Sequence, residues 1–232
     1  MKDLTFLKQN LIAHRGVHIN EPENSINAIK KAIKKNYIIE FDVHLLKDNT
    51  IIVFHDDNLK RMTGIDKKLK DCTYDEIKNI KLLNTNNHIP TLKEILEIVA
   101  GKVPIIIELK YDQKTGKLEK ELVKILDNYQ GQFCVKSFNP FSIRWFKKNR
   151  PNYIRGLLIS HKTKKKRFIS NKLMIFLTKP DFISCNYKLY KNSKIKKQMK
   201  KIPVIAWTIK NDKNYNKFKD KFYNLIIDIY KD

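Results

Sequence analysis

Apolar and polar positions along the chain follow two periodicities. Eight short runs are rich in β-branched and other apolar residues, and amphipathic segments such as SINAIKKAIKKN (25–36) and TGKLEKELVKILDNY (115–129) lie between most of them. Strands that alternate with helices indicate right-handed parallel crossovers. The eight runs comprise residues 11–16, 37–46, 103–110, 132–138, 155–160, 181–187, 203–209 and 224–230.

Eight such units predict an α/β fold, namely a closed (β/α)8 TIM barrel, with a doubly wound open sheet as the alternative. A longer stretch between the second and third predicted strands interrupts this regular alternation. After the turn KDNT, the run IIVFHD (51–56) is expected to extend the second strand or pair back on it, and the following residues, about 57–100, are expected to form a small insertion. No repeat or linker divides the chain, so we expect a single domain over residues 1–232.

The formal net charge of +24 is unevenly distributed. Residues 1–130 hold 22 basic and 19 acidic side chains, whereas residues 131–232 hold 26 and 5. Lysine supplies 42 of the 48 basic residues, a bias that A/T-rich coding produces without selection for function. The asymmetry nevertheless favours an anionic partner. We expect the basic run 162–167 and the apolar helix after it, 168–177, either to contact an anionic membrane peripherally or simply to pack on the barrel.

Other classes of protein are disfavoured by what the sequence lacks. No run approaches the roughly 18 consecutive apolar residues of a membrane span, and the first residues do not resemble a secretory signal, so a cytoplasmic protein is expected. Cys72, Cys134 and Cys185 are odd in number and widely spaced, which indicates neither a disulfide framework nor a zinc site. The oligomeric state is left open.

Ionisable side chains fall on one face of two predicted strands. Because side chains alternate along a strand, Glu40, Asp42 and His44 share a face, and Glu108 and Lys110 share a face of the next strand. These faces are expected to line the barrel lumen near the carboxyl ends of the strands, where barrels of this kind keep their active sites. A salt bridge to a lysine is the structural alternative. Carboxylates that converge without enough fixed positive charge are relieved by a divalent cation, and oxygen ligands favour Mg²⁺ or Ca²⁺.

Five segments follow one another along the chain, namely HRG with PENS, IEFDVHLLKDNTIIVFHD, IPTLKEILEIV, IIIELK and VIAWTI. Together they resemble the successive motifs of the glycerophosphodiester phosphodiesterase family. The likeness is dense over residues 11–110 and weak over 139–200. The family is a (β/α)8 barrel with a small insertion after the second strand, and it hydrolyses glycerophosphodiesters to glycerol 3-phosphate and an alcohol with a divalent metal.

The resemblance implies a role for each matching residue. It makes Glu40, Asp42 and Glu108 ligands of one divalent cation, Mg²⁺ or Ca²⁺, and it makes His14 and His55 the general base and acid, in an order that stays open. It also places Arg15 and Lys110 at the substrate phosphate and Trp207 beside the glycerol moiety. A phosphodiester anion with a poor leaving group requires such a set of charges and proton-transfer groups.

Several neighbouring residues have simpler expected roles. Gly16 is expected to allow a sharp turn and a close approach of the backbone to a ligand. Glu23 and Asn24 are expected chiefly at the start of a helix, with Asn24 or Ser25 as its N-cap. His18 and His44 are interpreted as bystanders.

Three functional hypotheses follow. The first is the metal-dependent glycerophosphodiesterase, whose partner is a small-molecule glycerophosphodiester. The second is a lysophospholipase D or a phosphatidylinositol phospholipase C-like enzyme, which needs an apolar groove near the insertion. The third is a non-catalytic basic module that binds an anionic polymer, although converging carboxylates would repel a polyanion, so no nucleic acid is expected.

Overall fold

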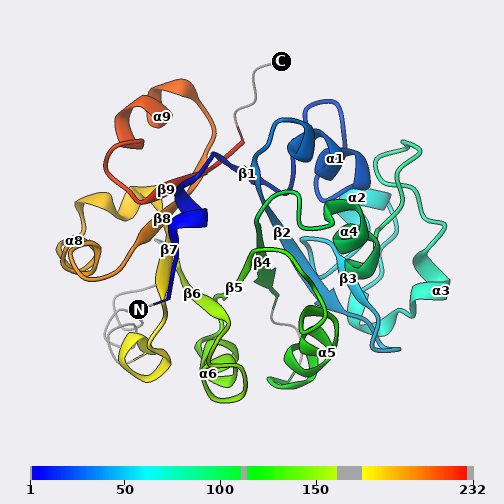
Figure 1. Ribbon diagram of the computed structural model, residues 1–232. Helices are drawn as coiled ribbons and strands as arrows, with labels where there is room; N and C mark the ends of the chain where they lie inside the picture. The colour runs from blue at the N-terminus through cyan, green and yellow to red at the C-terminus, as the bar shows by residue number, and fades with distance from the viewer. Residues whose placement is uncertain (1, 111–113, 161–173, 229–232) are drawn as a thin grey trace.

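Eight parallel strands close into a barrel in the computed structural model, which describes residues 2–110, 114–160 and 174–228 (Figure 1). Each strand pairs with the next, and the last strand pairs with the first through Ile12 opposite Ile226. The (β/α)8 prediction is therefore confirmed over the open-sheet alternative. The strands are β1 (Ile12–His14), β2 (Ile38–Leu45), β4 (Ile105–Leu109), β5 (Phe133–Ser137), β6 (Ile154–Ile159), β7 (Phe182–Asn186), β8 (Val204–Ile209) and β9 (Asn224–Ile227).

Helices surround the strands and cover their outward apolar faces (Figure 1). Helix α1 begins where the Ser25 hydroxyl accepts a hydrogen bond from the Ala28 N–H, which confirms Ser25 as an N-cap. Thr91 and Glu94 form a reciprocal capping box at the start of α4. The outer helices are α1 (Ile26–Lys34), α4 (Leu92–Val99), α5 (Lys117–Leu126), α6 (Pro140–Asn149), α8 (Ser193–Met199) and α9 (Asp212–Phe218), and the 3₁₀ helix η3 (Tyr187–Lys191) precedes α8.

The segment after β2 contains a small lobe with its own apolar cluster. Strand β3 (Ile51–Val53) pairs antiparallel with β2, as expected for IIVFHD, and α2 (Lys60–Thr63), η2 (Leu69–Asp71) and α3 (Tyr74–Ile77) follow. The lobe's buried residues include Phe54, Leu59 and Ile89. Helix α4, within the expected insertion of 57–100, instead packs with the barrel core and α1.

The barrel lumen has an apolar lower layer and a charged upper layer. The lower layer is closed by the 3₁₀ helix η1 (Thr5–Lys8), whose Phe6 and Leu7 are buried there. Because side chains alternate along β2 and β4, the residues above Ile38 and Ile106 on the same faces are Glu40 and Glu108. The lumen residues of the lower layer are Ile12, Ile38, Ile106, Cys134, Phe182, Ile205 and Ile226.

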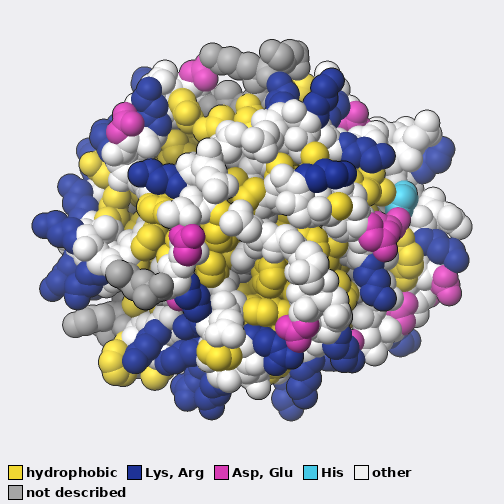
Figure 2. Space-filling view, in the orientation of Figure 1, with side chains coloured by type: hydrophobic (Ala, Val, Ile, Leu, Met, Phe, Trp, Pro, Cys, Tyr) yellow, Lys and Arg dark blue, Asp and Glu magenta, His cyan; other side chains and the backbone are white. Residues whose placement is uncertain are grey.

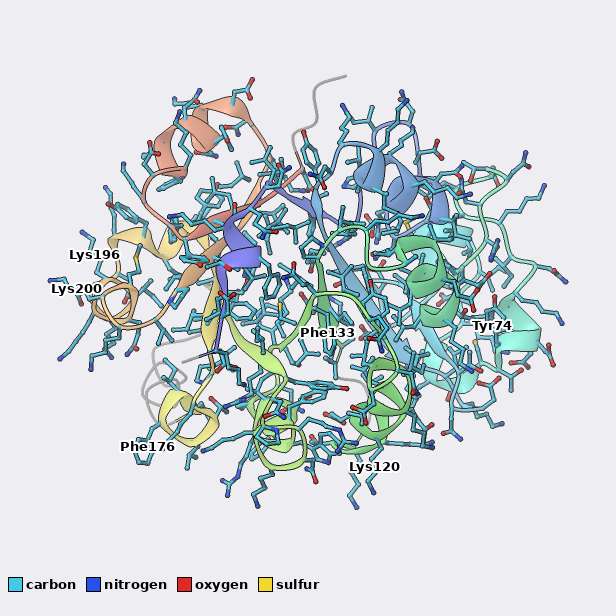
Figure 3. The ribbon with its side chains drawn as sticks, in the orientation of Figure 1. Tyr74, Lys120, Phe133, Phe176, Lys196 and Lys200 are labelled. Atoms are coloured by element: carbon cyan, nitrogen blue, oxygen red, sulfur yellow. The ribbon has the colours of Figure 1, made fainter. Side chains whose placement is uncertain are left out.

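Lysine and arginine side chains gather at the left and lower edges of the face in Figure 2, and the lysines of α8 and the turn after it, Lys196 and Lys200, point outward in Figure 3.

The basic run 162–167 and most of the predicted apolar helix lie outside the described residues. Residues 174–178 are helical, and Phe176 is 70% exposed. Peripheral membrane contact therefore stays a prediction. No helix among the described residues is long and apolar enough to cross a membrane.

Candidate active site

Three carboxylates converge in the upper layer of the lumen. Glu40 and Asp42 come from β2, Glu108 comes from β4, and all three are buried. The strand register places Asp42 directly opposite Glu108. One oxygen of each carboxylate lies within 4.8 Å of the other two. The structure thus brings together the three residues that the sequence analysis named as cation ligands.

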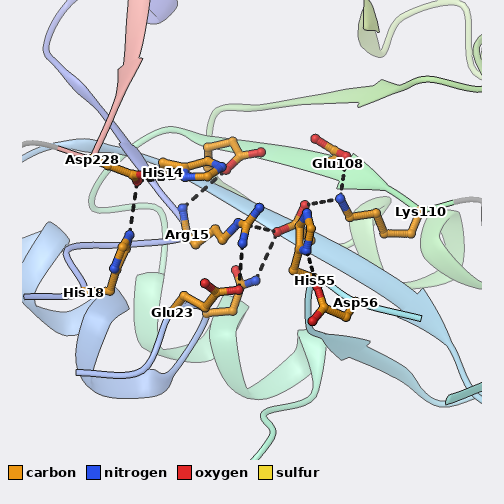
Figure 4. Close-up of polar contacts among 12 residues, drawn as sticks. His14, Arg15, His18, Glu23, His55, Asp56, Glu108, Lys110 and Asp228 are labelled. Carbon is orange, nitrogen blue, oxygen red and sulfur yellow. Dashed lines mark hydrogen bonds and ion pairs between the residues drawn. The ribbon is translucent and has the colours of Figure 1, made fainter. Parts of the chain in front are cut away.

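Positively charged side chains contact these carboxylates, whereas the argument for a cation from the sequence assumed too little fixed positive charge around them. The Lys110 ammonium lies 2.8 Å from Asp42 Oδ1 and 2.7 Å from Glu108 Oε1, and Arg15 Nε lies 3.3 Å from Asp42 Oδ2 (Figure 4). Burial alone raises the pKa of Asp42, but Lys110 and Arg15 outweigh it and hold that pKa far below its usual range. Electrostatic repulsion among the carboxylates therefore does not by itself require a metal.

A third cation, Lys136 on β5, was missed by the sequence analysis. Its ammonium lies 2.8 Å from Glu40 Oε1 and 3.2 Å from Glu108 Oε2. Burial lowers the pKa of Lys136, but the nearby glutamates more than compensate, so its pKa is raised and it is charged. The strand alternation could have revealed it, because Lys136 shares the face of Cys134, which lies in the lumen.

Arg15 and Gly16 form the turn that follows β1. Both have positive φ angles, 57° and 79°. A Cβ atom on Gly16 would lie 2.7 Å from the Ala28 carbonyl carbon, so glycine is required by the backbone of α1. The predicted sharp turn is confirmed, and the close approach that the structure shows is to the backbone of α1. The turn aims the Arg15 guanidinium at Asp42 and Glu23.

An ion-pair chain that the sequence did not reveal connects this turn to the small lobe. Glu23 accepts from Arg15 at 2.7 Å and from Arg61 of α2 at 2.6 Å. Arg61 also contacts Asp56 at 2.5 Å, and Asp56 in turn contacts His55. Glu23 therefore does more than start a helix, because it couples the end of β1 to the residues after β3.

His14 ends β1, and its ring is oriented by the last strand of the barrel. Its Nδ1 lies 2.8 Å from Oδ1 of Asp228, which follows β9, and His18 Nε2 lies 3.1 Å from the same oxygen (Figure 4). A carboxylate can only accept, so the ring N–H groups donate. Burial raises the pKa of Asp228, but hydrogen bonds from the two histidines outweigh it and depress that pKa. His18 therefore shares the Asp228 carboxylate with His14.

His55 follows β3 and has a matching arrangement. Its Nδ1 lies 2.6 Å from Asp56 Oδ1, and burial lowers its pKa below the usual value near 6.5. His44 is fully buried, and its Nε2 lies 3.2 Å from the His55 carbonyl oxygen. This contact gives His44 a structural place behind β3, in keeping with its interpretation as a bystander.

Two further groups border the carboxylates and the lumen. Asn24 donates to Asp42 Oδ2 at 3.1 Å, while its own Oδ1 is buried and has no hydrogen-bond partner among the described residues. Trp207 on β8 packs beside the apolar lumen layer, and its ring stands edge-on to that of the exposed Phe138, with centroids 5.7 Å apart. The Trp207 indole N–H is likewise buried without a partner among the described residues.

Comparison with known proteins identifies relatives of this chain. A profile of the glycerophosphoryl diester phosphodiesterase family matches residues 14–226. A glycerophosphodiester phosphodiesterase of Caldanaerobacter subterraneus subsp. tengcongensis is 35% identical over 163 residues, which cover 66% of this chain and 67% of the relative. An enzyme of that name from Thermotoga maritima has a crystal structure with a TM-score of 0.78 and 25% identity, covering 95% of each chain.

A third likeness concerns the fold. The structure of an Oleispira antarctica phosphodiesterase in complex with its product, sn-glycerol 3-phosphate, superposes with a TM-score of 0.85 at 21% identity and covers 96% of this chain and 94% of the other. The family match spans most of the sequence and nearly the whole barrel. The chain therefore belongs to the glycerophosphoryl diester phosphodiesterase family of enzymes.

Proposed function

We propose that the upper lumen hydrolyses water-soluble glycerophosphodiesters to glycerol 3-phosphate and an alcohol, with a divalent cation and the pair His14 and His55. The observation that carries this proposal is the shared geometry of the two histidines. Each presents Nδ1 to a carboxylate, Asp228 or Asp56, at 2.8 or 2.6 Å. An imidazole oriented in this way directs Nε2 to proton transfer.

The carboxylate cluster fits a hard divalent cation. Glu40, Asp42 and Glu108 offer three oxygens within 4.8 Å of one another, and the unpartnered Oδ1 of Asn24 beside Asp42 offers a fourth. Oxygen-only ligation favours Mg²⁺ or Ca²⁺. Such a cation, when bound, supplies a Lewis acid for the non-bridging phosphate oxygens.

The two histidines divide the proton transfers. One imidazole takes the proton from the attacking oxygen, and the other gives a proton to the oxygen that leaves. Because burial lowers the pKa of His55, this ring is neutral at pH 7 before substrate binds. Neutral His55 can act directly as a base, and it must first gain a proton if it acts as the acid.

In this proposal Arg15 and Lys110 bind the substrate phosphate. Their side chains are 15% and 16% exposed, so both remain accessible while they contact Asp42. An anionic substrate would gain two charge-assisted contacts as charge develops on its phosphate. The partly buried ring of Trp207 beside the lumen suits the glycerol part of the substrate.

The surface beside His55 favours a polar head group over an acyl chain. A groove there is lined by His55, Lys110 and six residues between 56 and 66, and every lining side chain is polar or charged. This lining argues against lysophospholipid or phosphatidylinositol substrates with a chain along this groove. Membership of an enzyme family argues against a non-catalytic basic module.

The substrate class is tested by following release of choline, which leaves with the same bond cleavage in glycerophosphocholine, where the other product is glycerol 3-phosphate, and in lysophosphatidylcholine, where it is lysophosphatidic acid. We expect glycerophosphocholine to be hydrolysed at least tenfold more efficiently, by kcat/KM, than lysophosphatidylcholine presented below its micelle concentration. A preference for lysophosphatidylcholine would replace the proposal with lysophospholipase D activity. Inactivity on both, with folded protein and added Mg²⁺ or Ca²⁺, would contradict both enzyme hypotheses.

A further inference from the structure

Lys136 places a permanent ammonium group inside the carboxylate cluster. Lys136 is 2% exposed, and its Nζ lies 2.8 Å from Glu40 Oε1 and 3.2 Å from Glu108 Oε2. The strand register sets Lys136 directly opposite Glu108 on the neighbouring strand. Two of the three carboxylates of the proposed cation site are thus already ion-paired with Lys136.

The other two cations of the cluster differ from Lys136 in accessibility. The side chains of Arg15 and Lys110 are 15% and 16% exposed, whereas the side chain of Lys136 is 2% exposed. Arg15 and Lys110 can therefore transfer their contacts from Asp42 to a substrate phosphate that enters from solvent. Lys136 lies on β5 with the apolar Cys134 below it on the same face, so its ammonium stays with Glu40 and Glu108.

Counting formal charges shows the consequence. Three carboxylates face three cationic side chains, and a bound divalent ion would leave the cluster with a net charge of +2 until substrate phosphate arrives. Two like charges that share carboxylate ligands a few ångströms apart repel strongly in a buried site. Lys136 also neutralises the charge of Glu40 and Glu108 in the absence of the ion. These carboxylates therefore gain less free energy when the ion binds.

We propose that Lys136 sets the cation affinity of this enzyme, acting as a fixed counter-ion that competes with the divalent ion for Glu40 and Glu108. This inference rests on the cation site of the proposed function. It makes the free enzyme a weak binder of Mg²⁺ or Ca²⁺, and it predicts that the cation binds more tightly together with an anionic phosphate ligand than alone.

Calorimetric titration of substrate-free protein with Ca²⁺, and separately with Mg²⁺, tests the inference. Lys136→Met keeps a similar side-chain length and removes the charge, so we expect its Kd to fall at least about tenfold below that of the wild type. Lys136→Arg keeps the charge and should remain within about threefold of the wild type. Arg155→Met removes another buried cation, on β6 next to Asp181, and should leave the Kd unchanged.

The outcomes separate this inference from the proposed function. Tighter binding by Lys136→Met, including the case in which only this variant binds measurably, supports the inference. Equal or weaker binding by Lys136→Met, while the wild type binds, overturns the inference and leaves the cation site intact. No binding by either protein overturns both. Thermal denaturation checks that each variant is folded, and if Lys136→Met does not fold, Lys136→Gln is titrated with the same expected direction.

Discussion

His14 Nδ1 lies 2.8 Å from Asp228 Oδ1, although 214 positions separate the two residues in the sequence. The contact exists because β9 pairs with β1 and closes the barrel. It fixes the ring of His14 through a carboxylate that His18 and Lys210 also contact. Closure of the barrel and orientation of a proposed catalytic base or acid therefore depend on the same two strands.

Replacing Asp228 by Asn should weaken the orientation of His14 while preserving shape. We expect kcat to fall by roughly tenfold or more, yet by less than the ~10²–10⁴-fold contribution of a complete general acid or base. KM and the Kd for Ca²⁺ should change little. Steady-state kinetics checks this, with Asp220→Asn as the control because Asp220 is an exposed acid nearby in sequence. A change confined to KM would show that Asp228 acts on binding instead.

Removing either histidine should abolish proton transfer and leave cation binding intact. His14→Ala and His55→Ala are each expected to lower kcat by at least about 10²-fold. The measurement pairs initial rates with calorimetric titration of Ca²⁺ into the same preparations. If one variant lost cation binding, that histidine would be a ligand, and the division of roles between the carboxylates and the imidazoles would be wrong.

Gly16→Ala should destabilise the fold more than Gly64→Ala. Both glycines have a φ of 79°, so alanine at either position carries the left-handed backbone cost of about 1 kcal/mol. Only at Gly16 would the new Cβ clash, because it would lie 2.7 Å from the Ala28 carbonyl carbon. The clash adds roughly 1–3 kcal/mol at Gly16. Urea denaturation of the two variants checks the difference, and equal losses would mean that α1 shifts freely.

Acidification should lower the free energy of unfolding, in part because burial of His55 disfavours its protonated form in the folded protein. Burial places its folded-state pKa below the usual value near 6.5, so the unfolded chain binds more protons as the pH falls through that range. The contribution of His55 is therefore present above about pH 6.5 and is lost as the pH falls through the lower folded-state pKa. Urea denaturation at pH 7.5 and 5.5 should show a smaller loss for His55→Gln than for the wild type. An equal loss would place the pH dependence on other groups.

The sequence predicted the barrel and most of the site because strand periodicity carries that information. Alternation along β2 and β4 puts Glu40, Asp42 and Glu108 on lumen faces, and the structure places them there. Lys136 escaped notice because a lysine in a strand is usually solvent-exposed. The available signal was that Lys136 lies two positions after Cys134 on the same strand, so both side chains point into the lumen.

Contacts between distant segments left weaker traces in the sequence. Asp228 acquires its partners His14 and His18 only when the last strand lies beside the first, which local patterns do not encode. The pairing of Glu23 with Arg61 crosses from the end of β1 to the small lobe and likewise has no local pattern. The salt bridge to a lysine, which the sequence analysis kept as the alternative, is present in the structure, because Lys110 contacts both Asp42 and Glu108.

The most direct test of the account follows glycerophosphocholine by ³¹P NMR, with wild type and Glu108→Gln, after removal of divalent ions with EDTA and after re-addition of Mg²⁺ or Ca²⁺. We expect sn-glycerol 3-phosphate from the wild type only with the cation present. Glu108→Gln should lose at least about 10²-fold in rate, partly restored by excess cation, because one of three anionic ligands is gone. Hydrolysis that continues unchanged in EDTA, or full activity of Glu108→Gln, would contradict a cation-assisted reaction at this carboxylate cluster.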